Sequence, residues 1–110
     1  MKFTKGATAN GTSLQGYINA TYDQLVAAFG APDYGPDDQG DKVTCEWCFE
    51  FENGVVATIY DWKMGYTPYG YYEWHIGGET KQAVWLVTQA FEASKDALYN
   101  MVKEYDNEHN

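Results

Sequence analysis

Apolar and polar residues alternate most regularly between residues 43 and 51, where every second position is apolar or a cysteine. A period of two predicts a β-strand with one face on a core. The run stops at Asn53-Gly54, a dipeptide preferred in two-residue type I′ turns, and residues 55–62 form a second run. The pattern therefore predicts a β-hairpin with Trp47 opposite Tyr60.

This register also predicts which hairpin residues share a face of the sheet. One face would carry five aromatic residues and a valine: Trp47, Phe49, Phe51, Val56, Tyr60 and Trp62. The other face would be mixed, and either solvated or part of an interface: Glu46, Glu50, Ala57, Ile59 and Asp61. Glu46 and Asp61 would lie opposite each other.

The remaining elements follow from caps and periodicity. Thr21 with Gln24 three residues later forms a capping box, and Gly30 followed by Pro32 ends a short helix. We expect strands near residues 1–11, at 12–18 with Leu14 and Ile18 facing inward, and at 71–76, where Gly77-Gly78 ends the strand. Apolar residues spaced by three and four predict a long helix from about Thr80 to Tyr105: Val84, Val87, Phe91, Leu98, Met101 or Val102, and Tyr105. Trp85 and Leu86 lie partly off this stripe.

The expected fold is a single α+β domain over residues 1–110. A small antiparallel β-sheet of four to six strands would carry one short and one long helix packed on it. Residues 106–110 form a polar tail that we expect to fray.

Charge excludes several functional classes. The 110 residues include seven lysines, no arginine and sixteen acidic residues, which gives a net charge of −9. Duplex nucleic-acid binding and binding to an anionic membrane both favour a basic surface, so both are disfavoured. An aromatic content of 17% disfavours disorder. With no secretory signal and no apolar run of membrane-spanning length, we expect a cytoplasmic protein.

Candidate catalytic and metal-binding groups are few. Cys45 and Cys48 would point to opposite faces of a strand, so we interpret them as reduced thiols rather than a disulfide or zinc site. No nucleophile, base and orienting group can be named together. We therefore expect no enzymatic activity, no cofactor and no metal.

The candidate binding site lies between residues 62 and 81. Gly77-Gly78 before a helix would let a ligand approach the backbone, and free amides at the helix start attract phosphate; an ordinary strand-to-helix turn explains the glycines equally well. Aromatic rings would stack on a purine, and lysines would hold phosphates. The predicted site comprises Trp62, Lys63, Tyr72, Trp74, His75, Gly77, Gly78 and Lys81.

The aromatic residues outnumber what one small core absorbs. Phe29, Trp47, Phe49, Phe51 and Phe91 fit a core, whereas a second group is harder to bury: Tyr17, Tyr60, Trp62, Tyr66, Tyr69, Tyr71, Tyr72 and Trp74. Clustered exposed aromatics indicate an interface or a stacking platform. We expect a homo-oligomer, with the ligand site near a subunit boundary.

Four segments carry a resemblance to a known family: GTSLQGYI (11–18), TYDQLVAAFG (21–30), EFENGVVATIYDWK (50–63) and WHIGG (74–78). Together they resemble the first family of phage Thoeris anti-defence proteins, in element order over residues 3–105. The resemblance implies a small α+β homo-oligomer, a dimer or a hexamer built from dimers, in the cytoplasm of an infected bacterium. It implies a sponge that binds glycosidic cyclic ADP-ribose signals without cleaving them, in some members also cyclic oligonucleotides. The family's phosphate contacts include arginine, which this chain lacks.

Two other functions remain open. An acidic inhibitor that mimics the charge of DNA would bind a basic host or defence protein through residues 33–41 and the hairpin carboxylates. A structural protein of the virion is the third possibility.

Overall fold

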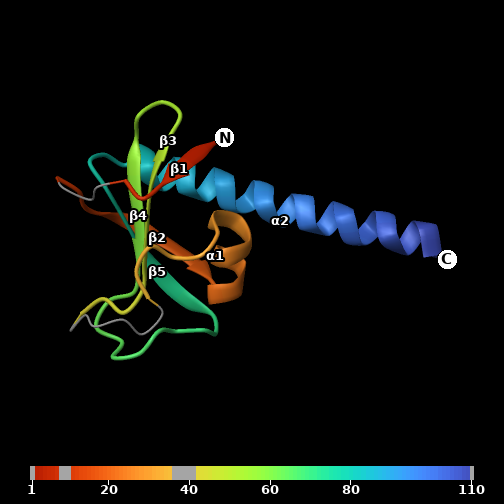
Figure 1. The fold of residues 1–110 in the computed structure, drawn as a ribbon, viewed down its shortest axis with the longest axis horizontal. Helices are drawn as coiled ribbons and strands as arrows, with labels where there is room; N and C mark the ends of the chain where they lie inside the picture. Colours follow the sequence, from red (N-terminus) through yellow and green to blue (C-terminus); the bar gives the residue numbers. More distant parts are fainter. Residues whose placement is uncertain (1, 8–10, 36–41, 110) are drawn as a thin grey trace.

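The computed structural model describes residues 2–7, 11–35 and 42–109. In chain order the elements are β1 (Phe3–Lys5), β2 (Ser13–Ala20), α1 (Tyr22–Phe29), β3 (Glu46–Phe51), β4 (Val56–Tyr60), β5 (Tyr72–Gly78) and α2 (Gln82–His109). All neighbouring strands are antiparallel, in the order β1-β3-β4-β5-β2. Both helices lie on the same side of this sheet (Figure 1). The predicted α+β fold with one short and one long helix is confirmed.

The short helix α1 has the predicted capping box. The Thr21 side chain accepts a hydrogen bond from the Gln24 amide at 3.1 Å, and the Gln24 side chain accepts one from the Thr21 amide at 2.9 Å. Gly30 has φ +82° and ends the helix. Leu25 and Phe29 are the buried residues of α1, so the helix is fixed to the core by one side.

The hairpin between β3 and β4 is confirmed, but its predicted register is wrong by one residue. Trp47 pairs with Ile59, and Tyr60 pairs with Glu46. The loop has three residues instead of two, because the Phe51 amide donates to the Val55 carbonyl at 2.9 Å and the Gly54 amide donates to the Phe51 carbonyl at 2.9 Å. Gly54 alone takes up the left-handed backbone, at φ +86°, as in a hairpin with a glycine bulge.

The corrected register exchanges the two faces of β4. Ala57 and Ile59 lie on the core face with Trp47 and are fully buried, whereas Tyr60 lies on the opposite face. A one-residue shift has this effect because side chains alternate along a strand. The face of the sheet not covered by the helices is called the open face below.

Two further predictions near β5 are wrong. Gly77 and Gly78 do not break the strand after Ile76 but are its last two residues, and they pair with both β2 and β4. A Cβ on Gly78 would lie 2.5 Å from the Ala83 side chain, and one on Gly77 would lie 2.4 Å from the Thr58 hydroxyl. Close packing therefore accounts for both glycines. Leu14 is 46% exposed, not inward, while Ile18 is buried as predicted.

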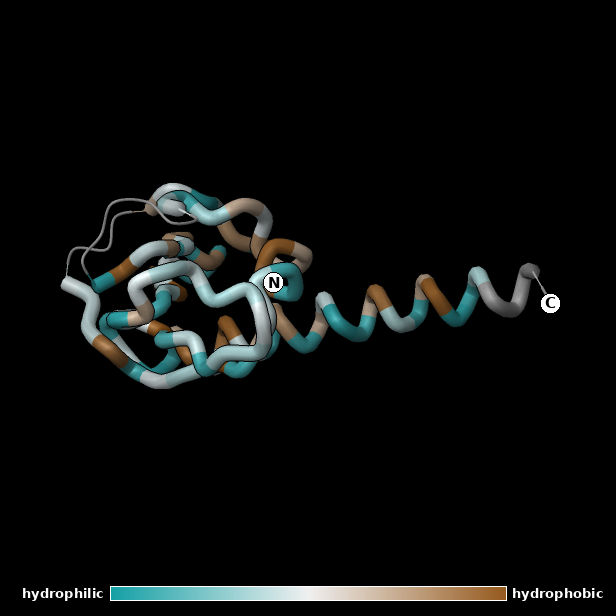
Figure 2. The backbone as a smooth tube through the Cα atoms, turned by 90° about the horizontal axis from the view of Figure 1, so that it is seen from below, coloured by the Kyte–Doolittle hydropathy of each residue, from teal (hydrophilic) through white to brown (hydrophobic). Residues whose placement is uncertain are grey.

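Helix α2 packs on the sheet through its N-terminal part only. Val87 and Phe91 are buried, as their place on the predicted apolar stripe of the helix indicates. Leu86 is buried too, although it lies partly off that stripe. The C-terminal part projects beyond the sheet, and hydrophobic positions recur along it (Figures 1 and 2). The helix is assigned through His109, and the fraying of residues 106–110 stays a prediction. No helix among the described residues is long and apolar enough to cross a bilayer.

The loop of the hairpin generates a first prediction. Gly54→Ala should lower the free energy of unfolding by about 1–2 kcal/mol, because a side chain at positive φ costs that much. Urea denaturation measures the change. Gly70→Ala is the matched control, since Gly70 has no positive φ and nothing within 4 Å of an added Cβ. Equal stability of the two variants would contradict the assigned loop.

Candidate ligand-binding face

The structure separates the eight predicted site residues into three places. Trp62, Lys63 and His75 come together at the open face. Tyr72 and Trp74 lie on the core side of β5, and Gly77, Gly78 and Lys81 lie at the junction of β5, β2 and α2.

Trp74 is a core residue, which corrects the expectation that it is hard to bury. It is 0% exposed, its indole nitrogen donates to the Ala20 carbonyl at 3.0 Å, and its ring meets Trp47 edge to face at 5.5 Å. Tyr72 is half-buried beside it, and the Tyr72 hydroxyl accepts a hydrogen bond from the Trp62 amide at 3.1 Å. Tyr72 therefore positions Trp62.

The groups around Lys81 are bonded within the chain. The Lys81 ammonium donates to the Gln15 carbonyl at 3.0 Å. The first amides of α2 are also engaged: Gln82 donates to the Thr80 hydroxyl at 3.3 Å and Ala83 to the Thr80 carbonyl at 3.2 Å. A phosphate at this helix start would have to displace these bonds.

The open face carries four rings from three strands and the segment after β4. We call Tyr17, Tyr60, Trp62 and His75 the aromatic face. The His75 ring is at its centre, 5.0 Å from Tyr17, 5.4 Å from Tyr60 and 6.3 Å from Trp62. Tyr17 and Trp62 are 47% and 40% exposed, so both offer ring surface to a ligand.

Two lysines flank this face. The ammonium groups of Lys42 and Lys63 each lie 5.8 Å from the centre of the Trp62 ring. The Lys63 amide donates to the Lys42 carbonyl at 2.6 Å, which ties the two segments together. Lys63 has φ +57°, the only left-handed backbone outside glycine among the described residues. Positive charge is thus concentrated beside an exposed ring.

The buried carboxylate of Asp61 fixes these two segments. It is 0% exposed and accepts hydrogen bonds from the Thr44 amide at 2.7 Å, the Thr44 hydroxyl at 2.6 Å and the Cys45 amide at 3.1 Å. The expected opposition of Asp61 and Glu46 is wrong, because Glu46 pairs with Tyr60. Asp61 anchors the start of the 61–70 loop, so Trp62 and Lys63 leave the sheet at a defined point.

Burial favours the neutral forms of two groups of the aromatic face, His75 and Tyr60. Burial lowers the pKa of His75 below its usual value, against the opposing effect of Glu73 and Asp61. The His75 Nδ1 atom is buried without a hydrogen-bond partner. Burial, with Glu46 nearby, raises the pKa of Tyr60. A neutral aromatic surface suits stacking on a planar ring better than general acid–base chemistry.

The thiols are unsuited to nucleophilic chemistry. Cys45 and Cys48 are both buried and are not joined in a disulfide, as expected for reduced thiols. Burial, followed by the charges of Glu46 and Asp33, raises the pKa of Cys48 to about 11. Its thiol donates to the Ala7 carbonyl at 2.6 Å. Since the thiolate is the reactive form, Cys48 is unreactive at neutral pH.

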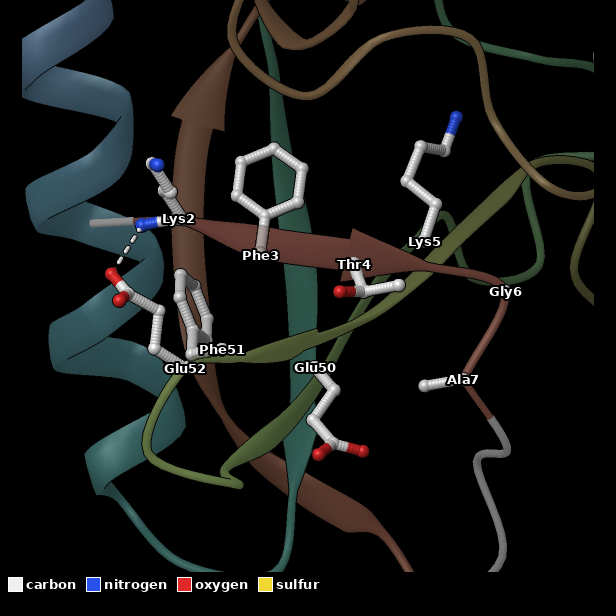
Figure 3. A pocket seen from close by; sticks show the side chains of 9 residues that line it. All are labelled: Lys2, Phe3, Thr4, Lys5, Gly6, Ala7, Glu50, Phe51 and Glu52. Carbon is white, nitrogen blue, oxygen red and sulfur yellow. Dashed lines mark hydrogen bonds between the residues drawn. The ribbon is translucent and has the colours of Figure 1, made fainter.

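A cavity of about 610 Å³ lies elsewhere, along β1 and the end of β3 (Figure 3). Several of its polar groups are bonded within the chain: the Lys5 ammonium donates to the Ala31 carbonyl, and the Lys2 amide donates to the Glu52 carboxylate at 3.0 Å. β1 has only three residues and is flanked by lysines, features that protect a sheet edge from pairing. None of the predicted site residues lines this cavity.

Comparison with protein families, curated proteins and solved structures finds no match to this chain. The argument for function therefore depends on the site itself. Its residues that the predicted set missed are Tyr17, Tyr60 and Lys42. Tyr17 and Tyr60 were recognisable as surplus aromatics, but placing them beside His75 requires the true register.

The pKa of His75 gives a prediction with a defined sign. A base with a lowered pKa in the folded state binds protons more strongly when unfolded, so stability should fall as pH drops through 6.5 and below. Proton NMR should report a His75 pKa under 6.5. Thermal melts from pH 7.5 to 5 of the protein and of His75→Gln should differ in slope. A His75 pKa at or above 6.5 would contradict the buried position of Nδ1.

Proposed function

We propose that this chain is a binding protein that holds a nucleotide-class ligand on its aromatic face without transforming it. The observation that carries the proposal is the pairing of exposed rings with two ammonium groups. Trp62 and Tyr17 supply stacking surface for a planar base, and Lys42 with Lys63 supplies charge for phosphate. Stacking on an aromatic side chain is worth about 1–3 kcal/mol per base.

The ligand we propose is a cyclic nucleotide immune signal of the glycosidic cyclic ADP-ribose type, with cyclic oligonucleotides as further candidates. Support for this identity comes from the resemblance of residues 11–18, 21–30, 50–63 and 74–78 to the phage Thoeris anti-defence family. In this proposal the protein acts in the cytoplasm of an infected bacterium and sequesters the signal. The lysine pair would replace the arginines of that family as phosphate contacts, without their bidentate geometry.

The charge-mimic alternative depends on different residues. Asp61 is buried and hydrogen-bonded, so it contributes nothing to an acidic surface. Residues 36–41 of the predicted mimic segment lie outside the described residues. Salt-sensitive binding to a basic host protein, without any bound nucleotide, would favour the mimic. Co-purification with virus particles would favour a virion protein.

Ligand titration by calorimetry tests the binding proposal. The protein should bind a glycosidic cyclic ADP-ribose, and Trp62→Ala should weaken binding by about tenfold or more, because 1.4 kcal/mol corresponds to a factor of ten. Trp85→Ala is the control, since Trp85 is 58% exposed on α2, the helix on the opposite side of the sheet from the aromatic face. Mass spectrometry after denaturation should recover the ligand intact. A cleaved product would identify an enzyme, and equal affinity in both variants would remove the aromatic face as the site.

We also propose a homo-oligomer formed through the projecting part of α2. Large apolar side chains are exposed there: Leu98, Tyr99, Met101, Val102 and Tyr105. Leu98, Met101 and Tyr105 continue the seven-residue spacing of Val84, Val87 and Phe91, whose stripe packs on the sheet. An apolar groove of about 460 Å³ runs between α1 and α2 beside Leu98 and Val102. A second copy fits this stripe because a two-fold axis pairs identical surfaces.

Light scattering measures the oligomer directly. The protein should have a mass of at least twice 12.5 kDa at micromolar concentration. Leu98→Asp combined with Met101→Asp should shift it to the monomer, because each places a charge in the apolar contact. Thr88→Asp with Gln89→Asp, on exposed positions nearer the sheet, is the matched control. A monomer in the unchanged protein would contradict this interface.

A further inference from the structure

We infer that Lys42 and Lys63 form a two-ammonium site that selects ligands with at least two negative charges, such as a pyrophosphate, over singly charged ones. This inference rests on the proposed function, since it names the charge of the ligand held at the aromatic face. It also assigns a role to Lys42, which the sequence did not single out, and to the unusual backbone of Lys63.

The geometry brings two charges to one side chain. Both ammonium groups lie 5.8 Å from the centre of the Trp62 ring, within range of a cation–π interaction. The bond from the Lys63 amide to the Lys42 carbonyl holds the two backbones together, and the Asp61 carboxylate holds the adjoining residues. The backbone segments that carry the two lysines are therefore held together before a ligand arrives.

No carboxylate neutralises this pair within the described part of the chain. Asp61, two residues before Lys63, is turned inward and bonded to Thr44 and Cys45. Asp41, which precedes Lys42, lies outside the described residues. The ion pair found among the described residues joins Lys95 to Glu92, on α2. Two like charges beside one ring repel each other, so a singly charged anion would compensate only one of them. A doubly charged ligand compensates both.

Lys63 takes a backbone conformation that a lysine adopts at a cost. At φ +57° its Cβ crowds the neighbouring carbonyl, which Gly or Asn would tolerate better. Such strain persists where the surrounding structure enforces it, and it clusters at ligand-binding positions. Here the bond to Lys42 and the anchored Asp61 enforce it, and the result is an ammonium group directed to Trp62.

The test compares ligands that differ in charge but share a base. The probes are ADP, which carries a pyrophosphate, cyclic AMP, which carries one phosphodiester charge, adenosine, and inorganic pyrophosphate. Calorimetry in low salt should show ADP binding about tenfold or more tightly than cyclic AMP, because charge-assisted contacts are the stronger ones. Adenosine should bind more weakly than either nucleotide.

The variants are Lys42→Gln and Lys63→Asn. Asparagine tolerates the left-handed backbone, so Lys63→Asn removes the charge while keeping the turn. Either variant should reduce the preference for ADP over cyclic AMP to less than about threefold, because only one of the two ammonium groups then remains beside Trp62. Lys103→Gln, an exposed lysine on α2, removes the same charge elsewhere and should leave the preference unchanged. Thermal melts confirm that each variant is folded.

The possible outcomes separate this inference from the proposed function. Equal binding of ADP and cyclic AMP, or a preference that survives both substitutions, would overturn the lysine pair and leave nucleotide binding standing. Pyrophosphate binding that needs both lysines, with no gain from the adenosine group, would support the pair and contradict the nucleotide proposal. No binding by any probe would overturn both.

Discussion

The three-residue loop at Glu52–Gly54 determines the arrangement of the whole domain. Gly54 takes the one left-handed position in this loop, and the turn that results sets β3 and β4 in a register where Trp47 faces Ile59. Because β4 also pairs with β5, the register of the hairpin determines which residues of β4 lie beside β5. Ile59 pairs with Ile76 on the core face, and Tyr60 pairs with His75 on the open face. With a two-residue turn, Ile59 would leave the core and Tyr60 would enter it. The same backbone preference thus determines both the core and the aromatic face.

The buried carboxylate of Asp61 then fixes the two segments that form one end of the aromatic face. A buried carboxylate is costly unless its oxygens are hydrogen-bonded, and Asp61 meets that requirement with two amides and a hydroxyl from residues 44 and 45. These bonds join the end of β4 to the segment before β3. They fix the point at which Trp62 and Lys63 leave the sheet, and they bring Lys42 to the same ring. The buried hydrogen bonds of Asp61 therefore position the segments that carry Lys42, Trp62 and Lys63 at the surface.

The sequence predicts features that depend on neighbouring residues, but not those that depend on contacts between segments far apart in the chain. The capping box at Thr21 and the existence of the hairpin depend on neighbouring residues, and both predictions were confirmed. Asn53-Gly54 is compatible with a two- or a three-residue loop, so the register could not be fixed from that dipeptide. Gly77 and Gly78 looked like strand breakers because the side chains that require them, Thr58 and Ala83, are visible only in the folded chain.

The candidate site likewise contains some residues that the sequence predicts and others that only the fold brings to the site. The sequence predicts Trp62 and Lys63 because they are adjacent to surplus aromatics, and His75 because it lies in the strand that leads into Gly77-Gly78. Trp74 was placed with them by proximity along the chain, yet it faces the core next to Trp47. Tyr17 and Lys42 come from segments far from residue 62 and reach the site only through the pairing of β2 with β5 and the bond between Lys42 and Lys63.

The two proposed surfaces lie on opposite sides of the sheet. Both helices cover one face, and the projecting part of α2 continues on that side (Figure 1). The rings of Tyr17, Tyr60 and His75 lie on the other face, because these paired residues alternate with the buried Ile18, Ile59 and Trp74. A second copy bound along α2 would leave the aromatic face of each protomer open. Ligand binding and self-association would then depend on separate residues, Trp62 with the lysine pair in one case and Leu98 with Met101 in the other. The overall charge of −9 repels anions at a distance, so a phosphate-bearing ligand must be held by short-range contacts. An exposed ring with two ammonium groups beside it supplies contacts of that kind.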